Sequence, residues 1–485
     1  MVVTPARPEP TGDGSVRCGS SGPAIGIVLP RHSIGAEGSD VLEWHARTTT
    51  GADEVETEYV AGALRAVLQH DASETSWRVR ASLDNSSDEP ISVSQVRLDI
   101  RPGDGLAWVW GAGAAGLVVL VTRDGGLWGF SLRRGTLRRE CEDVVWLDAG
   151  TTLAPGRRTT FELVGRRCHG WDEVASMLPA WLPPLAVRGG EPVDLALPDA
   201  GVVAAGCSIL EAPDGTEIRG AGVQQVNVHG VFGEVDLELA FAPTLADAVD
   251  RAGRQVARLV REVPGAVHQL DGTGPDERAR GLDRTARRLV LLQSAHSQEA
   301  ADVVRGWLLT GMTDLLQAGG TPGPFSLAAL AGEIQRRDDP QALQALMDAV
   351  PTAEAEPGMV LALTRVWAVV WGLGQDPEPV RQALAWVSSQ PARTRLEALE
   401  HALVAGDRAA APELLAVLGA GLPGAPVPLS EAWQQAYAVA LASLVTDEDQ
   451  SAPRLVQAAE MVARRLTARD PHDPDVLAWL LLGER

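Results

Sequence analysis

The hydrophobic period of this 485-residue chain changes near residue 244, and the change limits its possible folds more than any other feature. Before it, apolar residues alternate with polar ones, as in half-buried β-strands. Residues 77–85 and 91–100 are the clearest cases, with a slip of register near Gln95 that suggests a bulge. After it, apolar residues recur at helical spacing. The sequence therefore predicts a β-rich front and an all-helical back.

The strands of the front half are short and separated by turn residues. Asp124-Gly125 and Asp214-Gly215 are typical of β-hairpins, and no segment of helical period separates the strands between residues 77 and 164. This pattern favours an antiparallel β-sandwich over a parallel α/β sheet.

Proline-rich residues 179–184 divide the front, so we expect a sandwich domain over residues 24–182 and a smaller β unit over 185–243. Residues 1–23 are rich in Pro, Gly and Ser and are predicted to form a disordered tail. A connecting helix and a linker are expected over residues 244–274.

The back half, residues 275–485, has clear helix boundaries. About nine helices of roughly 10 to 18 residues with short loops predict antiparallel helical hairpins, arranged as an α/α toroid or a solenoid. Asp-Pro pairs place a capping carboxylate before a proline at the first helical position, and other helix starts and ends are marked by Ser and Gly. These boundary residues are Asp339-Pro340, Asp376-Pro377, Asp473-Pro474, Ser326, Ser430, Ser451, Gly374 and Gly406.

Charge and composition exclude several function classes. The net charge is −22 and the sequence contains no lysine, so phosphate backbones would be repelled and a Walker loop cannot form. No apolar run reaches membrane-spanning length, and the amino terminus lacks a signal-peptide core. We expect a cytoplasmic protein, with no nucleic-acid or membrane partner. The arginine-only basic residues, with abundant Gly and Ala, suggest a bacterium of high GC content.

Motifs for cofactors and metals are missing from the sequence. The glycine-rich residues 111–116 lie between β segments, whereas a dinucleotide loop needs a following helix. His169 stands near Cys168 and Asp172 without a second ligand at metal spacing, and the four cysteines form no CxxC. We expect no cofactor, no metal site and free thiols.

Carboxylates in the loops between the helices are the best catalytic candidates. Glycoside hydrolysis needs two carboxyl groups, one of them with a raised pKa. Glu354 and Glu356 lie in a loop with proline at both ends, and Trp367 and Trp371 follow one helical turn apart. We predict the glutamates as catalytic residues and the tryptophans as a sugar platform. Acidic loops are common in so acidic a chain, and core packing is the competing interpretation for the tryptophans.

Two resemblances to known families add to this interpretation. Residues 77–85, the paired strand to Asp99 and residues 126–132 resemble the β-supersandwich, galactose-mutarotase-like domains of glycoside hydrolases. In those enzymes such a domain often precedes an α/α toroid, which the shorter helical tail here resembles. Residues 458–482 are similar to the end of a tetratricopeptide-like hairpin.

Together these features predict a carbohydrate-associated protein that binds an oligosaccharide and is a degenerate or non-classical glycoside hydrolase. The alternative is a non-enzymatic scaffold whose helical solenoid docks a protein partner. A deep acidic pocket lined by tryptophan at one end of the helices would favour the first hypothesis over the second.

Overall fold

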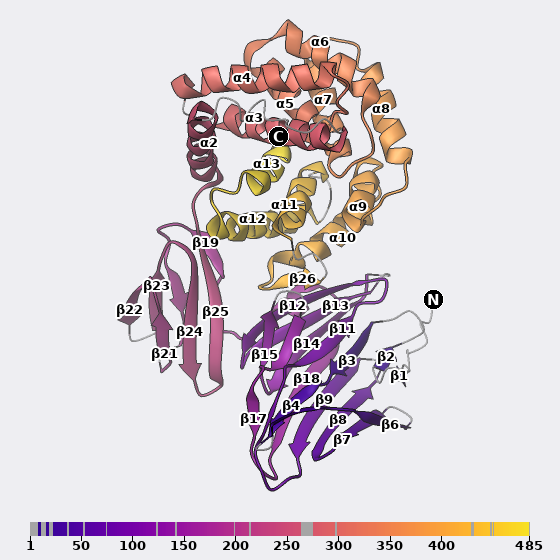
Figure 1. Cartoon of the computed structure of the whole chain (residues 1–485), viewed down its shortest axis with the longest axis vertical. Helices are drawn as coiled ribbons and strands as arrows, with labels where there is room; N and C mark the ends of the chain where they lie inside the picture. Colours follow the sequence, from indigo (N-terminus) through magenta and orange to yellow (C-terminus); the bar gives the residue numbers. More distant parts are fainter. Residues whose placement is uncertain are drawn as a thin grey trace.

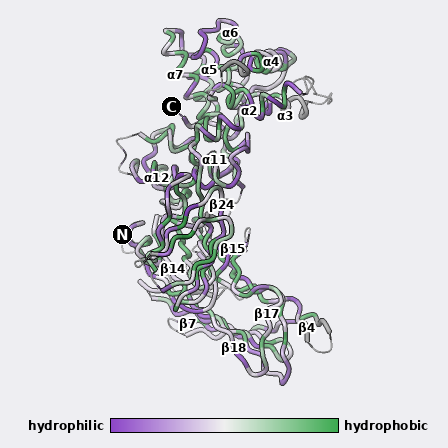
Figure 2. Tube along the Cα trace, turned by 90° about the vertical axis from the view of Figure 1, so that its left-hand side faces the viewer, coloured by the Kyte–Doolittle hydropathy of each residue, from purple (hydrophilic) through white to green (hydrophobic). Residues whose placement is uncertain are grey.

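The computed structural model describes residues 8–10, 16–18, 23–35, 38–51, 54–73, 75–122, 125–140, 143–197, 199–212, 215–262, 275–295, 298–427, 431–446, 449 and 451–484. Strands dominate the described chain up to Ala242, and helices dominate the rest, so the predicted division is confirmed. The helical half lies at one end of an elongated molecule, with β4 and β17 near the other end (Figures 1 and 2).

The front half contains two antiparallel sheets that share one strand. The first has the order β6 (His45–Thr50), β7 (Glu54–Ala61), β8 (Leu64–Ala72), β9 (Ser76–Asn85), β18 (Arg158–Cys168), β14 (Leu127–Arg134), β13 (Gly116–Val121) and β12 (Leu106–Gly113). The second has the order β1 (Pro8–Pro10), β2 (Val16–Cys18), β3 (Ala24–Val28), β11 (Val96–Arg101), β16 (Asp143–Leu147) and β15 (Leu137–Glu140). The end of β12 pairs with β15 and so joins the two sheets.

Apolar side chains of both sheets meet in one core, which confirms the predicted sandwich. Trp146 of β16 and Phe161 of β18 are both buried, and their ring centroids lie 5.7 Å apart. The slip near Gln95 also has a structural counterpart. The chain leaves β10 (Ile91–Val93), which belongs to a separate small sheet with β4 (His32–Gly35), β5 (Gly38–Val41) and β17 (Thr151–Leu153), and enters β11 with a register shift.

A second β unit follows the short helix α1 (Trp171–Ala175). Its strands are β19 (Ala186–Arg188), β20 (Val193–Leu195), β21 (Gly201–Ala204), β22 (Ser208–Ala212), β23 (Gly215–Arg219), β24 (Gly222–Gly230) and β25 (Gly233–Ala242). All pairings in the described chain are antiparallel except β19 with β25. The hairpins predicted at Gly125 and Gly215 are confirmed by the paired strands on either side, although Asp124 and Asp214 lie outside the described residues.

The helical half closes on itself. The α-helices are α2 (Leu245–Glu262), α3 (Pro275–Ser294), α4 (Gln298–Gln317), α5 (Pro324–Arg337), α6 (Pro340–Ala349), α7 (Met359–Gly372), α8 (Glu378–Ser389), α9 (Arg395–Val404), α10 (Ala410–Val417), α11 (Ala432–Leu441), α12 (Ala452–Arg469) and α13 (Pro474–Leu482). The last helix, α13, packs against α3 and α11, as in a toroid. Helix α2 occupies the predicted position of the connecting helix. Within the described residues, no helix combines the length and apolarity needed to span a membrane.

Most predicted helix boundaries are confirmed. Asp339 and Asp473 accept hydrogen bonds from backbone N–H groups at the starts of α6 and α13. Asp376 also accepts one, from Glu378, but α8 begins one residue later than predicted, with Pro377 in the capping position. Gly374 and Gly406 have the positive φ values, 68° and 74°, that favour glycine at helix ends.

The serine caps are less successful predictions. Ser326 is wrong as an N-cap, because α5 begins earlier, at Pro324, with Gly323 in the capping position. Ser451 precedes α12 without a capping side-chain bond. Ser430 lies outside the described residues.

The two halves are joined through hydrogen bonds as well as packing. Strand β26 (Ala425–Val427), from the helical half, extends the first sheet by pairing with β12. Beside it, the indole Nε1 of buried Trp108 donates to the carbonyl of Pro423 at 2.8 Å. The guanidinium of Arg465 donates to the carbonyls of Gly424 and Leu422 at 2.9 and 3.1 Å. The helices are therefore held in a fixed position on the sandwich.

Candidate functional site

A cavity of about 890 Å³ opens where several helices of the closed array begin. The first residues of α5, α7, α11 and α13, or the residues just before them, form its walls together with the middle of α3. Helix N-termini carry partial positive charge and direct unpaired N–H groups outward. The lining residues are Leu282, Asp283, Arg284, Arg287, Thr321, Gly323, Pro324, Glu356, Pro357, Glu431, Ala432, Trp433, Asp473, Asp475, Val476 and Trp479.

Two tryptophans form the apolar wall of this helical pocket. Trp479 is buried at its base, and the ring of Trp433 lies 6.0 Å from it, with an interplanar angle of 31°. The indole Nε1 of Trp433 donates to Oε2 of Glu431, which orients the ring. Trp433 is only half-buried, so part of the ring is accessible from the cavity.

Arg287 is fixed between aromatic rings and carboxylates. Its guanidinium carbon lies 4.2 Å from the ring centroid of Phe325 and 5.7 Å from that of Trp479. Its nitrogens pair with Asp283 at 2.7 Å and, at a longer 3.8 Å, with Asp475. The arginine therefore fixes the position of the Asp283 side chain.

Glu356 has the most perturbed carboxyl group in the lining. The pocket walls displace water from it and raise its pKa, and the charges of Asp283 and Glu354 raise it further, against a smaller lowering by Arg393. The side chain remains open to solvent within the cavity. A β-carbon at Gly323 would lie 3.5 Å from its Oε2, so the carboxylate is close to the start of α5. Burial and the two neighbouring charges therefore favour the protonated form of this carboxyl group.

Below the cavity, a second carboxyl group is completely enclosed. Glu400 accepts hydrogen bonds from the backbone N–H groups of Gly358 and Leu361 at 3.1 and 2.7 Å, and from the hydroxyl of Tyr437. Burial raises its pKa to about 7, although these three bonds oppose the shift. It holds the start of α7, and Tyr437 packs beneath Trp479 with ring centroids 4.6 Å apart.

The structure separates the four site residues predicted from sequence. Glu356 lines the helical pocket, whereas Glu354 does not, although its charge acts on Glu356. The start of α7 lies beside the pocket, but Trp367 and Trp371 lie in the second half of this helix. Neither tryptophan lines the pocket. Their rings stack at 5.7 Å and are 39% and 63% exposed, so the competing interpretation of core packing is wrong.

Sequence reasoning missed Asp283, Arg287, Trp433 and Trp479 as pocket residues. The only sequence feature that marked this region was Asp473-Pro474, which predicted the start of a helix. The described residues contain no group of three or more His, Cys, Asp or Glu arranged to hold a metal ion. The described cysteines Cys168 and Cys207 are free thiols.

Comparison with known proteins supports the architecture. No protein-family model and no curated protein matches the sequence. A solved structure of a polysaccharide lyase aligns over 90% of this chain and 74% of its own, with a TM-score of 0.53 and 12% identity. An α-galactosidase of family GH36 from Geobacillus stearothermophilus covers 36% of this chain and 31% of its own, with a TM-score of 0.18 and 14% identity. A family 81 glycoside hydrolase from Clostridium thermocellum covers 80% and 65%, with a TM-score of 0.19 and 9% identity. At this identity the likeness to the lyase establishes a shared fold of sandwich and helical toroid.

Proposed function

We propose that the chain binds an oligosaccharide in the helical pocket and hydrolyses a glycosidic bond there. The carrying observation is that Glu356, Asp283 and the half-buried ring of Trp433 all line one cavity of about 890 Å³, a volume that accommodates a small-molecule ligand. The shared fold with a polysaccharide lyase supports a carbohydrate ligand.

In this proposal Glu356 is the proton donor. Its raised pKa keeps a larger fraction of the carboxyl group protonated at neutral pH than an ordinary glutamate would have. The proton passes to the bridging oxygen as the bond from that oxygen to the anomeric carbon breaks. The charge of Glu354 contributes to the raised pKa of Glu356. Of the predicted pair, Glu356 therefore donates the proton, and Glu354 acts only through its charge.

Asp283 takes the role of the second carboxylate. Its ion pair with Arg287, at 2.7 Å, holds the side chain in position at the pocket wall. A water molecule that attacks the anomeric carbon would transfer its proton to this carboxylate, which completes the hydrolysis. A proton donor and a second carboxylate are the two groups that glycoside hydrolysis requires, and both line this cavity.

The test is reducing-end release from a broad panel of oligosaccharides, with Glu356→Gln and Asp283→Asn compared with the wild-type chain. We expect the Glu356→Gln rate to fall by about 100-fold or more while oligosaccharide affinity is retained. Glu354→Gln is the matched control and should lose only a small part of the rate. Wild-type turnover by Glu356→Gln, or neither binding nor hydrolysis across the panel, would contradict the proposal.

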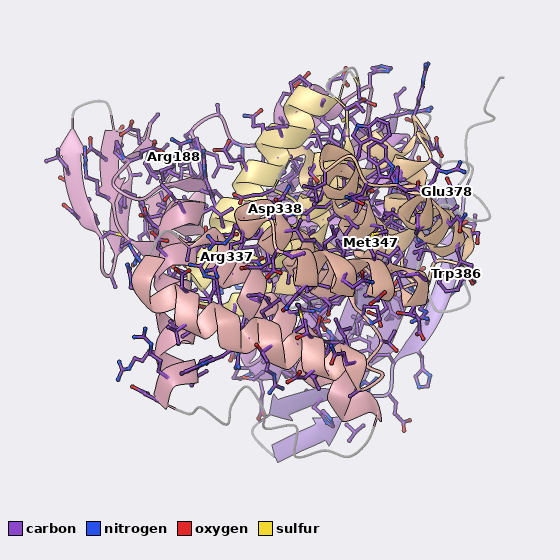
Figure 3. All side chains as sticks on the ribbon, turned by 90° about the horizontal axis from the view of Figure 1, so that it is seen from above. Arg188, Arg337, Asp338, Met347, Glu378 and Trp386 are labelled. Carbon is purple, nitrogen blue, oxygen red and sulfur yellow. The ribbon has the colours of Figure 1, made fainter. Side chains whose placement is uncertain are left out.

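A second candidate function is docking of a protein partner on the helical half. The observation in its favour is a set of exposed tryptophans in the helical half: Trp371 of α7, Trp386 of α8 and Trp307 of α4. Figure 3 shows Trp386 at the outer edge of the helical half. A protein that co-purifies at fixed stoichiometry, and is lost from a Trp371→Ser/Trp386→Ser variant, would favour this function. Retention of that protein by the variant would count against it.

A further inference from the structure

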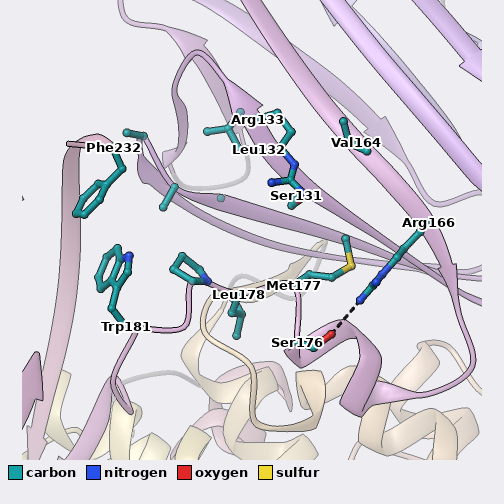
Figure 4. Close-up of a pocket in the computed structure, with 14 residues that line it drawn as sticks. Ser131, Leu132, Arg133, Val164, Arg166, Ser176, Met177, Leu178, Trp181 and Phe232 are labelled. Carbon is teal, nitrogen blue, oxygen red and sulfur yellow. Dashed lines mark hydrogen bonds between the residues drawn. The ribbon is translucent and has the colours of Figure 1, made fainter. Parts of the chain in front are cut away.

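A second cavity, of about 460 Å³, lies on the β half, away from the helical pocket. Four parts of the chain meet there: the strands β14 and β18, the turn between β12 and β13, the segment that follows α1, and the tip of the β24–β25 hairpin (Figure 4). The residues that line it are Ala114, Ala115, Gly116, Ser131, Leu132, Arg133, Val164, Arg166, Ser176, Met177, Leu178, Pro179, Trp181 and Phe232. We call this cavity the sandwich pocket.

The charge of the sandwich pocket is opposite to that of the protein. Its lining contains two arginines and no carboxylate, in a chain of net charge −22. Within the described residues, Arg133 makes no hydrogen bond or ion pair with the protein. An uncompensated cation in an acidic chain favours a ligand that carries negative charge.

Arg166 is already oriented for such a ligand. One of its terminal nitrogens donates to Oγ of Ser176 at 2.9 Å and to the carbonyl of Glu173 at 3.1 Å, as Figure 4 shows for the serine. A guanidinium has five N–H donors, so the other two nitrogens keep donors for a ligand. Because two bonds fix the group, little side-chain entropy is lost when an anion binds.

An aromatic pair forms another part of the wall. The rings of Trp181 and Phe232 stack at 5.1 Å with an interplanar angle of 16°, and both are only partly buried. Aromatic faces beside arginines and the hydroxyls of Ser131 and Ser176 suit a ring that is apolar on one face and polar at its edges. A sugar ring has that character.

The fold holds these parts of the chain in place. A β-carbon at Gly129 would come within 2.5 Å of Sδ of Met177, so the segment after α1 packs closely onto β14. The backbone N–H of Ala114 donates to the carbonyl of Glu234 at 2.9 Å, which ties the hairpin bearing Phe232 to the sandwich. The sandwich pocket is therefore formed before a ligand arrives.

We propose that the sandwich pocket binds an acidic sugar residue, with Arg133 and Arg166 on its anionic group and Trp181 against its ring. The choice of a sugar rests on the proposed function, and the negative charge rests on the arginines alone. The sandwich pocket is remote from the proposed reaction. It would hold one part of an acidic polysaccharide while the helical pocket hydrolyses another part of the same polysaccharide.

The experiment is calorimetric titration of the full chain with three probes of equal length. These are oligogalacturonate, its fully methyl-esterified form as a neutral match, and a sulfated chondroitin oligosaccharide. We expect oligogalacturonate to bind at least tenfold more tightly than the neutral ester, with an affinity that falls as salt is added. Tighter binding of the sulfated probe would identify sulfate as the anionic group, and tighter binding of oligogalacturonate would identify carboxylate; either result supports the site.

Variants separate this site from the helical pocket. Arg133→Gln and Trp181→Ala should each weaken oligogalacturonate binding about tenfold. Arg134→Gln is the matched control, because it removes the neighbouring charge from a residue outside the lining. Glu356 lies outside the sandwich pocket, so Glu356→Gln should leave oligogalacturonate binding there unchanged. Binding at the sandwich pocket can thus be tested even if the proposed hydrolysis fails. Equal affinity for the acid and its ester, equal affinity of Arg133→Gln and wild type, or no binding of any probe would overturn the proposal.

Discussion

The hydroxyl of Tyr437 donates a hydrogen bond to Oε2 of Glu400 in the interior of the helical half. Both side chains are completely buried, and the same carboxyl group accepts the backbone N–H groups at the start of α7. An acid in such a position links the pH of the solution to the stability of the toroid, because the unfolded chain exposes it to water.

We expect the free energy of unfolding to fall as the pH rises through 7. The folded-state pKa of Glu400 is about 7, above its ordinary value of 4.5. Its stabilising contribution is thus fully present below pH 4.5 and is lost as the pH rises to about 7, with a total of about 3 kcal/mol. Urea denaturation between pH 4.5 and 8 measures it. Glu400→Gln should flatten this pH dependence, and an unchanged slope in that variant would contradict the assignment.

His70 acts in the opposite direction in the sandwich. It is fully buried, its Nδ1 accepts a hydrogen bond from the indole Nε1 of Trp77 at 3.1 Å, and burial lowers its pKa from 6.5 to about 3. The unfolded chain takes up a proton below pH 6.5 while the folded chain does not. The stability is therefore present above pH 6.5 and declines below it, by about 2 kcal/mol at pH 5.

The difference in unfolding free energy between wild type and His70→Gln isolates this contribution from that of Glu400. We expect the difference to change between pH 6.5 and 5. His472→Gln, at an exposed position, is the control and should leave the wild-type slope intact. A slope that His70→Gln does not alter would show that another group titrates.

The sequence was most informative where a local pattern determines structure. The period of two in residues 77–85 predicted β9, and Asp473-Pro474 predicted the start of α13, because strand alternation and helix capping depend on neighbours in the chain. Glu356 was also selected from a local feature, its loop between helices, and it lines the helical pocket.

Residues that meet through the closure of the toroid could not be predicted. Arg287 lies between Phe325 and Trp479, nearly 40 and 200 residues further along the chain, and no local pattern records that contact. Trp367 and Trp371 show the converse. Their spacing correctly placed them on one face of α7, but only the packing of the helices shows that this face is exposed and lies outside the helical pocket.

Gly419 lies at the junction of the two halves, against a buried ring. Gly419 has a φ of 65°, and a β-carbon there would come within 2.3 Å of Cζ2 in the buried ring of Trp108. We expect Gly419→Ala to destabilise the chain by about 2–4 kcal/mol, from backbone strain and overpacking together.

Gly421→Ala is a close control for that prediction. Gly421 has a φ of 81°, but a β-carbon there would meet only Cε of Met461, at 3.8 Å. It should show the backbone cost of about 1 kcal/mol without the clash. Chemical denaturation of both variants measures the difference in their free energies of unfolding. Equal losses of stability would mean that the ring of Trp108 moves to accommodate the added methyl group.

The helical pocket and the exposed face of α7 make different predictions about sugar binding. Trp433 lines the cavity with Glu356, whereas Trp367 and Trp371 form a stacked pair outside it. If the helical pocket holds the sugar ring, Trp433→Ala should weaken oligosaccharide affinity about tenfold, the usual effect of an aromatic stacking contact. The double variant Trp367→Ala/Trp371→Ala should then leave affinity for short oligosaccharides unchanged.

Calorimetric titration with a short and a long oligosaccharide distinguishes the two surfaces. If the α7 double variant loses affinity only for the long oligosaccharide, the α7 pair is an accessory platform. A loss with the short one from the α7 variant, and none from Trp433→Ala, would place the sugar on α7 and contradict the helical pocket.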